Sequence, residues 1–184
     1  KKSHHSLTTK IIVMKKFISF FVITTFLFAN AVKAQVAWNT FQGGNLLDAG
    51  DAGSEVVVDQ NGYIYVTGSS MSTWGTPIRS FGGGPSDGYV AKFDNNGNLL
   101  WNTFLGGTGT DFCTSIAIDP VEGSIYVSGH GNSHWSSGFT INPFHGWNDA
   151  FIAKLTPSGN IQWVSYVGNI PVASTGVSVV HKNN

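Results

Sequence analysis

Three histidines and an aspartate in the second half of the chain could hold a metal ion. His130, His134 and His145 lie in one stretch that is rich in glycine and serine, and Asp149 follows them. Imidazole nitrogens and a carboxylate oxygen are ligands that Zn²⁺ accepts. A pair of histidines four residues apart converges on one side of a helix, however, and this composition favours a loop. Exposed loop histidines are therefore the simpler interpretation, and zinc is the alternative.

Acidic residues in the first half could supply the oxygen ligands that Ca²⁺ prefers. The three candidates are Asp48, Asp51 and Glu55, and the matching stretch of the second half keeps only Asp111. Solvated loop carboxylates would explain the same residues. We therefore predict no cofactor. The alternative is a calcium ion bound by these acids.

Aromatic side chains in the same regions favour ligand binding, because flat rings stack on sugars and anchor protein partners. Trp74 and Trp135 occupy one position in two repeats of the chain, which favours a packing role. Trp147 has no tryptophan counterpart in the first half and is the better ligand candidate. The candidate ligand-binding residues are Trp147, Trp135, Trp74, Phe144, His130 and His134.

Catalytic motifs are absent from the sequence. It contains no Gly-x-Ser-x-Gly elbow in a strand–turn–helix context, no His-Glu-x-x-His helix and no phosphate-binding loop. Two carboxylates of a hydrolase can still be brought together by folding alone, without any fixed spacing. The sequence therefore leans toward a protein that is not an enzyme, and we assign no catalytic residue.

Internal repeats in the sequence indicate the fold that positions these candidate side chains. Trp38-Asn-Thr-Phe-Gln-Gly-Gly returns as Trp101-Asn-Thr-Phe-Leu-Gly-Gly and again, in altered form, as Trp163-Val-Ser-Tyr-Val-Gly-Asn. Self-similarity at such a fixed period is typical of repeat architectures. We divide the chain into repeats at residues 38–100 and 101–162 and a partial third repeat at 163–184.

Each repeat reads as four short strands, because apolar runs are bounded by Gly, Asn and Pro. Asn-Gly and Ser-Gly pairs supply the positive φ that tight turns require. We expect long loops at 69–86 and 130–147 to share one end of the sheets, where function concentrates. The predicted strands are Glu55–Asp59, Tyr63–Gly68, Asp87–Asp94, Asn98–Leu105, Thr114–Asp119, Ser124–Gly129, Asn148–Leu155 and Asn160–Val167.

The order of these segments resembles the bacterial SBBP repeat, a β-propeller repeat of secreted and cell-surface proteins. W-x-T-F-L-G-G is followed by G-x-I-Y-V-x-G, D-A-F-I-A-K-L and G-N-I-Q-W, over about residues 38–184. The resemblance implies an all-β propeller of four-stranded antiparallel blades, commonly taken as seven-bladed, and transfers no catalytic residue. Because the chain has two complete repeats and part of a third, we expect a fragment of a larger propeller. Assembly from several short copies is the alternative.

A leader sequence accounts for most of the positive charge. Residues 14–34 combine Met14-Lys15-Lys16, an apolar run and Val32-Lys33-Ala34, which is typical of a signal peptide cleaved before Gln35. The apolar run is too short to span a bilayer. Residues 1–13 read as an upstream extension that is not native. We predict a secreted or cell-surface protein, residues 35–184, without a transmembrane segment.

Charge then limits the partners of the predicted mature chain. Residues 35–184 carry four basic residues against ten acidic ones, a net charge of −6. A protein without a basic patch gains no counterion release from a polyanion, which excludes nucleic acid. The sequence predicts a binding or scaffold module for a glycan or an extracellular protein. The alternative is an extracellular propeller hydrolase or lyase that uses clustered carboxylates.

Cleavage of the leader can be tested directly. The junction between Ala34 and Gln35 predicts that secreted material begins at Gln35 or at its cyclised form, because small residues stand at the −3 and −1 positions. N-terminal sequencing or intact mass of extracellular protein measures the start. An intact leader on that material would contradict the prediction.

Overall fold

The computed structural model describes residue 43, residues 50–135 and residues 138–168. All of them belong to the second of the chain's two units, Trp38–Asn184. The predicted leader and its cleavage site, Trp38, Asp48 and the tail of the third repeat therefore lie outside the described residues.

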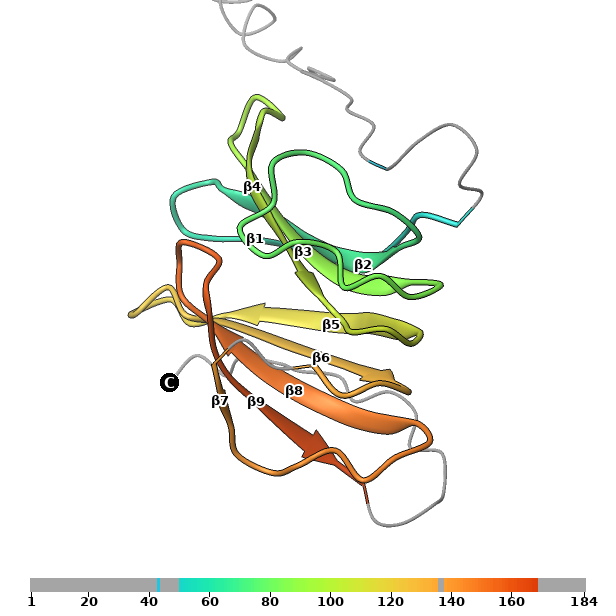
Figure 1. Ribbon diagram of the computed structural model, residues 1–184. Coiled ribbons are helices and arrows are strands. Elements are labelled where there is room, and N and C mark those ends of the chain that lie inside the picture. Colours follow the sequence, from blue (N-terminus) through green and yellow to red (C-terminus); the bar gives the residue numbers. More distant parts are fainter. Residues whose placement is uncertain (1–42, 44–49, 136–137, 169–184) are drawn as a thin grey trace, which may run out of the picture. The chain divides into compact units, whose positions relative to one another are not determined.

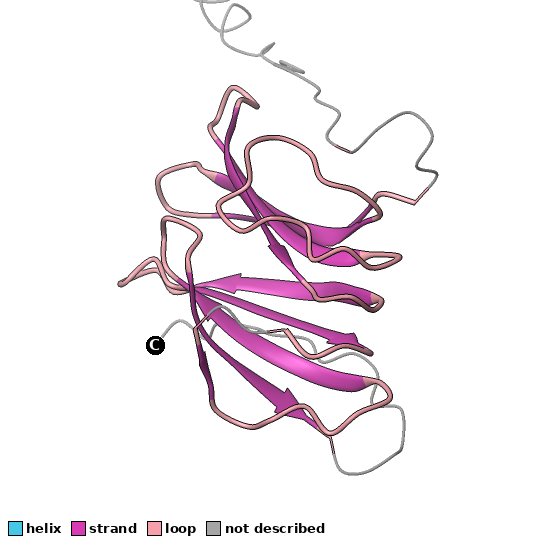
Figure 2. Ribbon diagram, in the orientation of Figure 1, coloured by secondary structure: helices cyan, strands magenta, loops and turns pink. Residues whose placement is uncertain are grey.

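The described residues form strands, turns and loops (Figure 2). They include no helix long and apolar enough to cross a membrane. The strands agree with the predicted ones to within a few residues. They are β1 (Ala52–Val58), β2 (Ile64–Ser70), β3 (Asp87–Phe93), β4 (Leu99–Leu105), β5 (Asp111–Ile118), β6 (Ile125–Gly131), β7 (Phe139–Thr140), β8 (Asp149–Leu155) and β9 (Ile161–Val167).

Two sheets are built from these strands (Figure 1). The first has the order β1-β2-β3-β4, all antiparallel, and the second has the order β5-β6-β8-β9-β7. The prediction of four antiparallel strands per repeat is thus confirmed for both sheets. β1 and β5 each contain a β-bulge. The register of β1 against β2 shifts between Gly53 and Glu55, and that of β5 against β6 shifts between Cys113 and Ser115.

The long loops do more than the sequence predicted. β7 lies inside the second loop and pairs in parallel with β9, at the outer edge of the sheet. The first loop does the same without forming a named strand: Ile78 N–H donates to Asn102 O (2.8 Å), and Phe104 N–H donates to Arg79 O (3.1 Å). Each loop therefore covers the edge of its own sheet, an edge that would otherwise offer free backbone groups to another chain.

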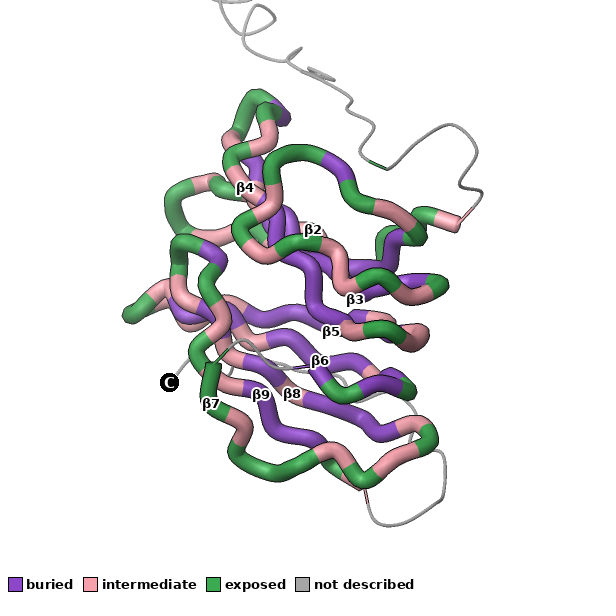
Figure 3. Tube along the Cα trace, in the orientation of Figure 1, coloured by how far each residue is buried: buried purple, intermediate pink, exposed green. Residues whose placement is uncertain are grey.

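A hydrophobic core lies between the two sheets, because β5 packs across the face of β1, β2 and β3. Tyr65, Val90 and Leu105 of the first sheet meet Cys113 and Ile116 of β5, and each of these five side chains is at most 1% exposed. Burial also raises the pKa of the Cys113 thiol to about 12, so the cysteine is an inert core residue. Figure 3 shows buried residues along the strands and exposed ones in the turns.

A second core covers the other face of the first sheet. Trp74, from the long loop, packs on Tyr89 and Phe104 with ring centroids 5.2 and 6.0 Å apart. Asn102 fixes the loop there, because its Nδ2 donates to Trp74 O (2.8 Å). The loop thus serves as part of the core as well as of the surface.

The turn between β8 and β9 locks the second sheet against the first. Gly159 has a φ of 84°, and its carbonyl oxygen accepts a hydrogen bond from Thr103 Oγ1 (2.7 Å). A Cβ placed on Gly159 would lie 2.7 Å from Ile78 Cδ1 and 2.8 Å from Trp101 Cε3. Gly62, in the turn between β1 and β2, has nearly the same φ of 81° and no atom within 4 Å of such a Cβ.

These two glycines form a matched pair for measuring the contact between the sheets. Gly62→Ala should lower the free energy of unfolding by about 1 kcal/mol, the cost of a side chain at positive φ. Gly159→Ala carries that cost plus a clash, so we expect a further loss of about 1–3 kcal/mol. Urea unfolding of the full chain measures both. Equal losses would show that the β8–β9 turn does not press on the first sheet.

Candidate functional site

Buried carboxylates stand at the loop end of the sheets, each at the first residue of a strand. Asp87, Asp111 and Asp149 begin β3, β5 and β8 and are at most 3% exposed. Each accepts a backbone N–H from the loop just before it: Asp87 from Gly82, Asp111 from Gly107 (3.0 Å) and Asp149 from His145 (2.7 Å). The three carboxylates thus fasten the return of each loop to its sheet.

Asp87 and Asp111 also interact with each other across the two sheets. Burial raises the pKa of Asp87 from 3.8 to about 6, and the charge of Asp111 adds to the rise. Burial likewise raises the pKa of Asp111, although Gly107 and Ser133 donate to it. Arg79 moderates both effects by its charge while its guanidinium donates to Phe104 O and Gly106 O (2.9 and 2.8 Å). These are the clustered carboxylates that folding brings together, and both side chains are 0% exposed.

Three of the predicted ligand-binding residues converge on Tyr166. Trp135, Phe144 and His134 place their rings 6.3, 5.3 and 6.1 Å from the Tyr166 ring. The Tyr166 hydroxyl accepts a hydrogen bond from Trp135 N–H (2.9 Å) and donates one to Trp135 O (2.8 Å). Sequence reasoning missed Tyr166, but the signal was present, because this tyrosine stands where the previous repeat has Phe104.

Burial separates the candidate tryptophans into two kinds. Trp74 is 7% exposed and Trp135 is 2% exposed, so both belong to the cores, as their recurrence favoured. Trp147 is 76% exposed and has a φ of 70°. It is the one residue other than glycine with a positive φ in the described part of the chain. Of the three candidate tryptophans, Trp147 is therefore the exposed one; Phe139, in the same long loop, is 70% exposed and pairs with β9.

The histidines do not gather into a metal site. The His130 ring packs at a tilt against Phe112, with ring centroids 5.3 Å apart, and burial lowers the pKa of His130 while Asp111 opposes the change. His134 stacks on Tyr166, whereas His145 Nδ1 lies 3.7 Å from Asp149 Oδ2. Across residues 50–135 and 138–168, no three His, Cys, Asp or Glu side chains form a group that could hold a metal ion.

Two of the three calcium candidates fall within the described residues. Glu55 Oε2 accepts the backbone N–H of Ile116 (2.7 Å), which joins β1 to β5 across the two sheets. Asp51 is exposed, and its Oδ1 accepts the N–H of Met71 (3.3 Å). Each carboxylate thus accepts a backbone hydrogen bond within the fold, and one oxygen of Glu55 is used in the contact between the sheets.

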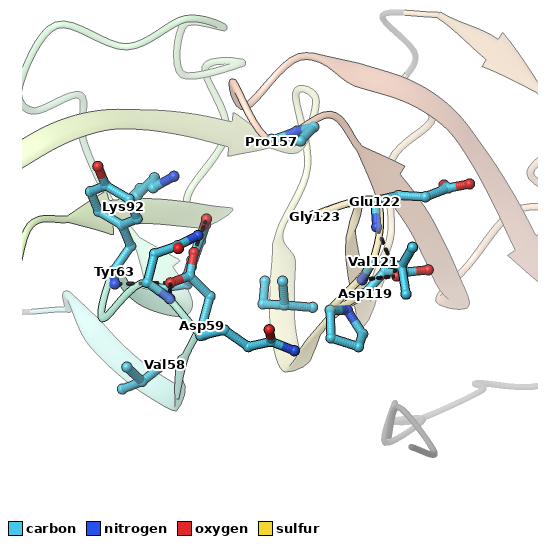
Figure 4. A pocket seen from close by; sticks show the side chains of 14 residues that line it. Val58, Asp59, Tyr63, Lys92, Asp119, Val121, Glu122, Gly123 and Pro157 are labelled. Atoms are coloured by element: carbon cyan, nitrogen blue, oxygen red, sulfur yellow. Dashed lines mark hydrogen bonds between the residues drawn. The ribbon is translucent and has the colours of Figure 1, made fainter. Parts of the chain in front are cut away.

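A hollow of about 470 Å³ lies at the opposite end, where the tight turns of the two sheets meet (Figure 4). Lys92 Nζ stands 4.1 Å from the centroid of the Tyr63 ring and 5.0 Å from that of Tyr65. Tyr65 donates its hydroxyl to Asp59 (3.1 Å). The hollow is lined by Val58, Asp59, Gln60, Asn61, Tyr63, Tyr65, Lys92, Ile118, Asp119, Pro120, Val121, Glu122, Gly123 and Pro157.

Two carboxylates of this hollow, those of Asp59 and Asp119, bind the backbone of their own turns. Asp59 Oδ1 accepts the N–H groups of Asn61 and Tyr63 (2.9 and 3.0 Å), and Asp119 Oδ1 accepts that of Val121 (2.8 Å). Such carboxylates close their turns by local hydrogen bonds. The sequence predicts function at the loop end and carries no signal for this hollow, because residues of both sheets form it only after the sheets pack.

One known protein family matches parts of both sheets. The SBBP family, described as a beta-propeller repeat, matches residues 47–76 and 100–134. The chain is similar to this repeat family over these two segments. The first SBBP match covers β1, β2 and the start of the long loop, and the second covers all but the first residue of β4 together with β5 and β6. No curated protein matches the chain.

The buried carboxylates predict a fall in the free energy of unfolding with rising pH. The folded pKa of Asp87, about 6, exceeds its ordinary value of 3.8, so the folded state binds more protons between these values. The contribution of Asp87 is therefore favourable below pH 4 and is lost as the pH rises through 6. Asp87→Asn should flatten this part of a plot of melting temperature against pH.

Asp94→Asn is the matched control for this experiment. Hydrogen bonds from Asn98 lower the pKa of Asp94, so its contribution is present above pH 4 and is lost as the pH falls below it. Asp94→Asn should change only the acid side of the plot. An Asp87→Asn variant with the same slope as the parent between pH 4 and pH 7 would show that Asp87 is not held protonated by burial.

Proposed function

We propose that this chain is a binding or scaffold module at the cell exterior, with a glycan or a protein as its ligand. The observation that supports this proposal most is the exposure of Trp147 and the positive φ of its backbone. This ring is 76% exposed, whereas Trp74 and Trp135 from the same kind of loop are buried. Its backbone conformation is one that side chains other than glycine rarely adopt.

The strain at Trp147 favours a role in recognition. A residue other than glycine at positive φ costs about 1–3 kcal/mol, and such positions cluster at ligand-binding sites. Exposure does not offset this cost, because an indole that stays in water gains little from burial. Strain that packing does not offset is best explained by a contact that the free chain does not make.

A hydrogen bond spans the segment that carries Trp147. Gly146, just before the tryptophan, has a φ of 104°. His145 N–H donates to Asp149 Oδ2 (2.7 Å), which ties the turn to the start of β8. An aromatic ring on a fixed turn loses little conformational entropy when it binds. Sugar faces and apolar protein pockets both accept such a ring.

An extracellular hydrolase or lyase is the alternative function, and the pair formed by Asp87 and Asp111 is the observation in its favour. Raised carboxylate pKa values are typical of general acids. Each carboxylate, however, is 0% exposed and accepts a backbone N–H of its own loop. That geometry supports a binding module better than a hydrolase.

Trp147→Ala tests the proposal against Trp135→Ala. Removing Trp147 should weaken ligand binding at least about tenfold and leave the melting temperature nearly unchanged, because its ring is exposed. Removing Trp135 should cost about 3–5 kcal/mol of folding free energy, the usual price of truncating a buried aromatic. A glycan array, pull-down from extracellular fractions and thermal melts of the full chain provide the measurements.

The two ligand classes separate in the same experiment. Binding on the array that is lost in Trp147→Ala identifies a glycan, and a captured protein lost in the same variant identifies a protein partner. Every detected ligand bound as before, or a Trp147→Ala variant that unfolds, would refute the assignment of Trp147.

A further inference from the structure

The hollow at the turn end is formed by the turns of both sheets. Figure 4 shows Tyr63 of the first turn on one side and Asp119 and Glu122 of the second turn on the other. The volume of the hollow, about 470 Å³, lies within the range of about 300–1,000 Å³ that is usual for small-molecule sites. The hollow is thus large enough to hold a small ligand between the two turns.

Several polar side chains of the hollow have no partner in the part of the chain that the structure describes. Lys92 Nζ stands 4.1 Å from the centroid of the Tyr63 ring, and no described carboxylate lies within 4 Å of it. Burial lowers the pKa of Lys92 while the charge of Asp59 opposes the change. Within the same described residues, the side-chain amides of Gln60 and Asn61 accept and donate no hydrogen bond. These groups are available to a ligand.

The charges of the lining balance one another at short range. Asp59 Oδ2 accepts the Tyr65 hydroxyl (3.1 Å), and its charge acts on Lys92. Glu122 Oε2 lies 3.6 Å from Lys154 Nζ. An anionic ligand would meet three carboxylates in the lining, and a cationic one would meet the Lys92 ammonium. Because either kind of ligand would face a like charge, the lining favours an uncharged one.

Apolar surface lies beside these polar groups. Val58 and Val121 line the hollow from opposite turns and are 63% and 91% exposed, and Tyr63 is 36% exposed. Pro120 and Pro157 add rigid aliphatic surface. A ligand that suits this lining has C–H groups on one face and hydroxyl groups at its edge, which is the chemistry of a sugar ring.

We propose that the turn-end hollow is a binding site for an uncharged saccharide. Lys92 Nζ and the amides of Gln60 and Asn61 bind the hydroxyl groups, and the Tyr63 ring packs on the C–H face. The site lies at the end of the sheets opposite to Trp147, so it does not rest on the function proposed for the loop end.

The second repeat offers a substitution for Tyr63 that the fold already accommodates. Tyr63 O accepts the N–H of Asp59 (3.0 Å), and Ser124 O accepts the N–H of Asp119 (2.8 Å) in the matching turn. Tyr63 and Ser124 therefore occupy the same turn position. Tyr63→Ser removes the ring from the hollow and introduces a side chain that the other repeat uses there.

The second repeat also supplies a matched control for Lys92. Lys92 pairs with Tyr65, and Lys154 pairs with Tyr126 at the same position of the second sheet. Lys154 Nζ likewise stands over a tyrosine ring, at 5.5 Å from the Tyr126 centroid, but Lys154 does not line the hollow. Lys92→Gln alters the proposed site, and Lys154→Gln makes the same chemical change outside it.

The experiment uses the full chain and a glycan array that carries neutral, uronate-containing and amine-containing oligosaccharides. The parent and Lys154→Gln should bind neutral oligosaccharides equally well. Tyr63→Ser and Lys92→Gln should each weaken this binding at least about tenfold. NMR titration with the best neutral oligosaccharide should shift the backbone amides of residues 60–63 and 121–123. Circular dichroism checks that each variant is folded, and if Lys92→Gln is not, Tyr63→Ser decides the test.

An array on which no neutral oligosaccharide is bound would overturn the proposal. Binding that is equal in the parent, Tyr63→Ser and Lys92→Gln would do so as well. Binding confined to uronate-containing or amine-containing oligosaccharides would contradict the preference for an uncharged ligand. If every bound glycan is lost in Trp147→Ala and retained in both variants of the hollow, the loop end is the glycan site, which supports the function proposed above and overturns this one.

Discussion

Burial of two apolar faces per sheet is the constraint on which this structure depends. A four-stranded sheet with apolar side chains on both sides needs a layer on each of them. In the described part of the chain, β5 provides that layer for one face of the first sheet, and the loop that carries Trp74 provides part of the other. The same requirement explains why the fold is repetitive, because each added sheet covers one face and brings another.

Hydrogen bonds at the two ends of the sheets complete the arrangement. At the turn end, Asp59, Asp94 and Asp119 each accept N–H groups of the turn that follows. At the loop end, Asp87 and Asp111 accept N–H groups of the loop that precedes them. Most acids named in the strand-flanking segments therefore hold the backbone, and this reduces the set that is free for chemistry.

The strands and the repeat were predictable from the sequence because they rest on local signals. Alternating apolar residues and the glycines of the tight turns, such as Gly97, mark strand ends without any tertiary contact. β7 was not predictable, because Phe139–Thr140 pairs in parallel with a strand more than twenty residues further along the chain. The display of Trp147 was only partly predictable: its lack of a counterpart was visible, but its φ and exposure depend on the folded loop. The turn-end hollow depends on the packing of two repeats.

The carboxylates at the first residues of the strands let the sequence of a loop vary without a change in the register of its sheet. Phe81 and Phe144 occupy matching places, in edge-to-face contact with Phe104 at 5.6 Å and with Tyr166 at 5.3 Å. The second loop reaches its aspartate one residue sooner. Both loops nevertheless return to the sheet through the same bond to a buried carboxylate. Insertions and substitutions between the aromatic anchor and the aspartate can therefore accumulate without shifting strand register, so each repeat is able to diversify its surface independently of its neighbours.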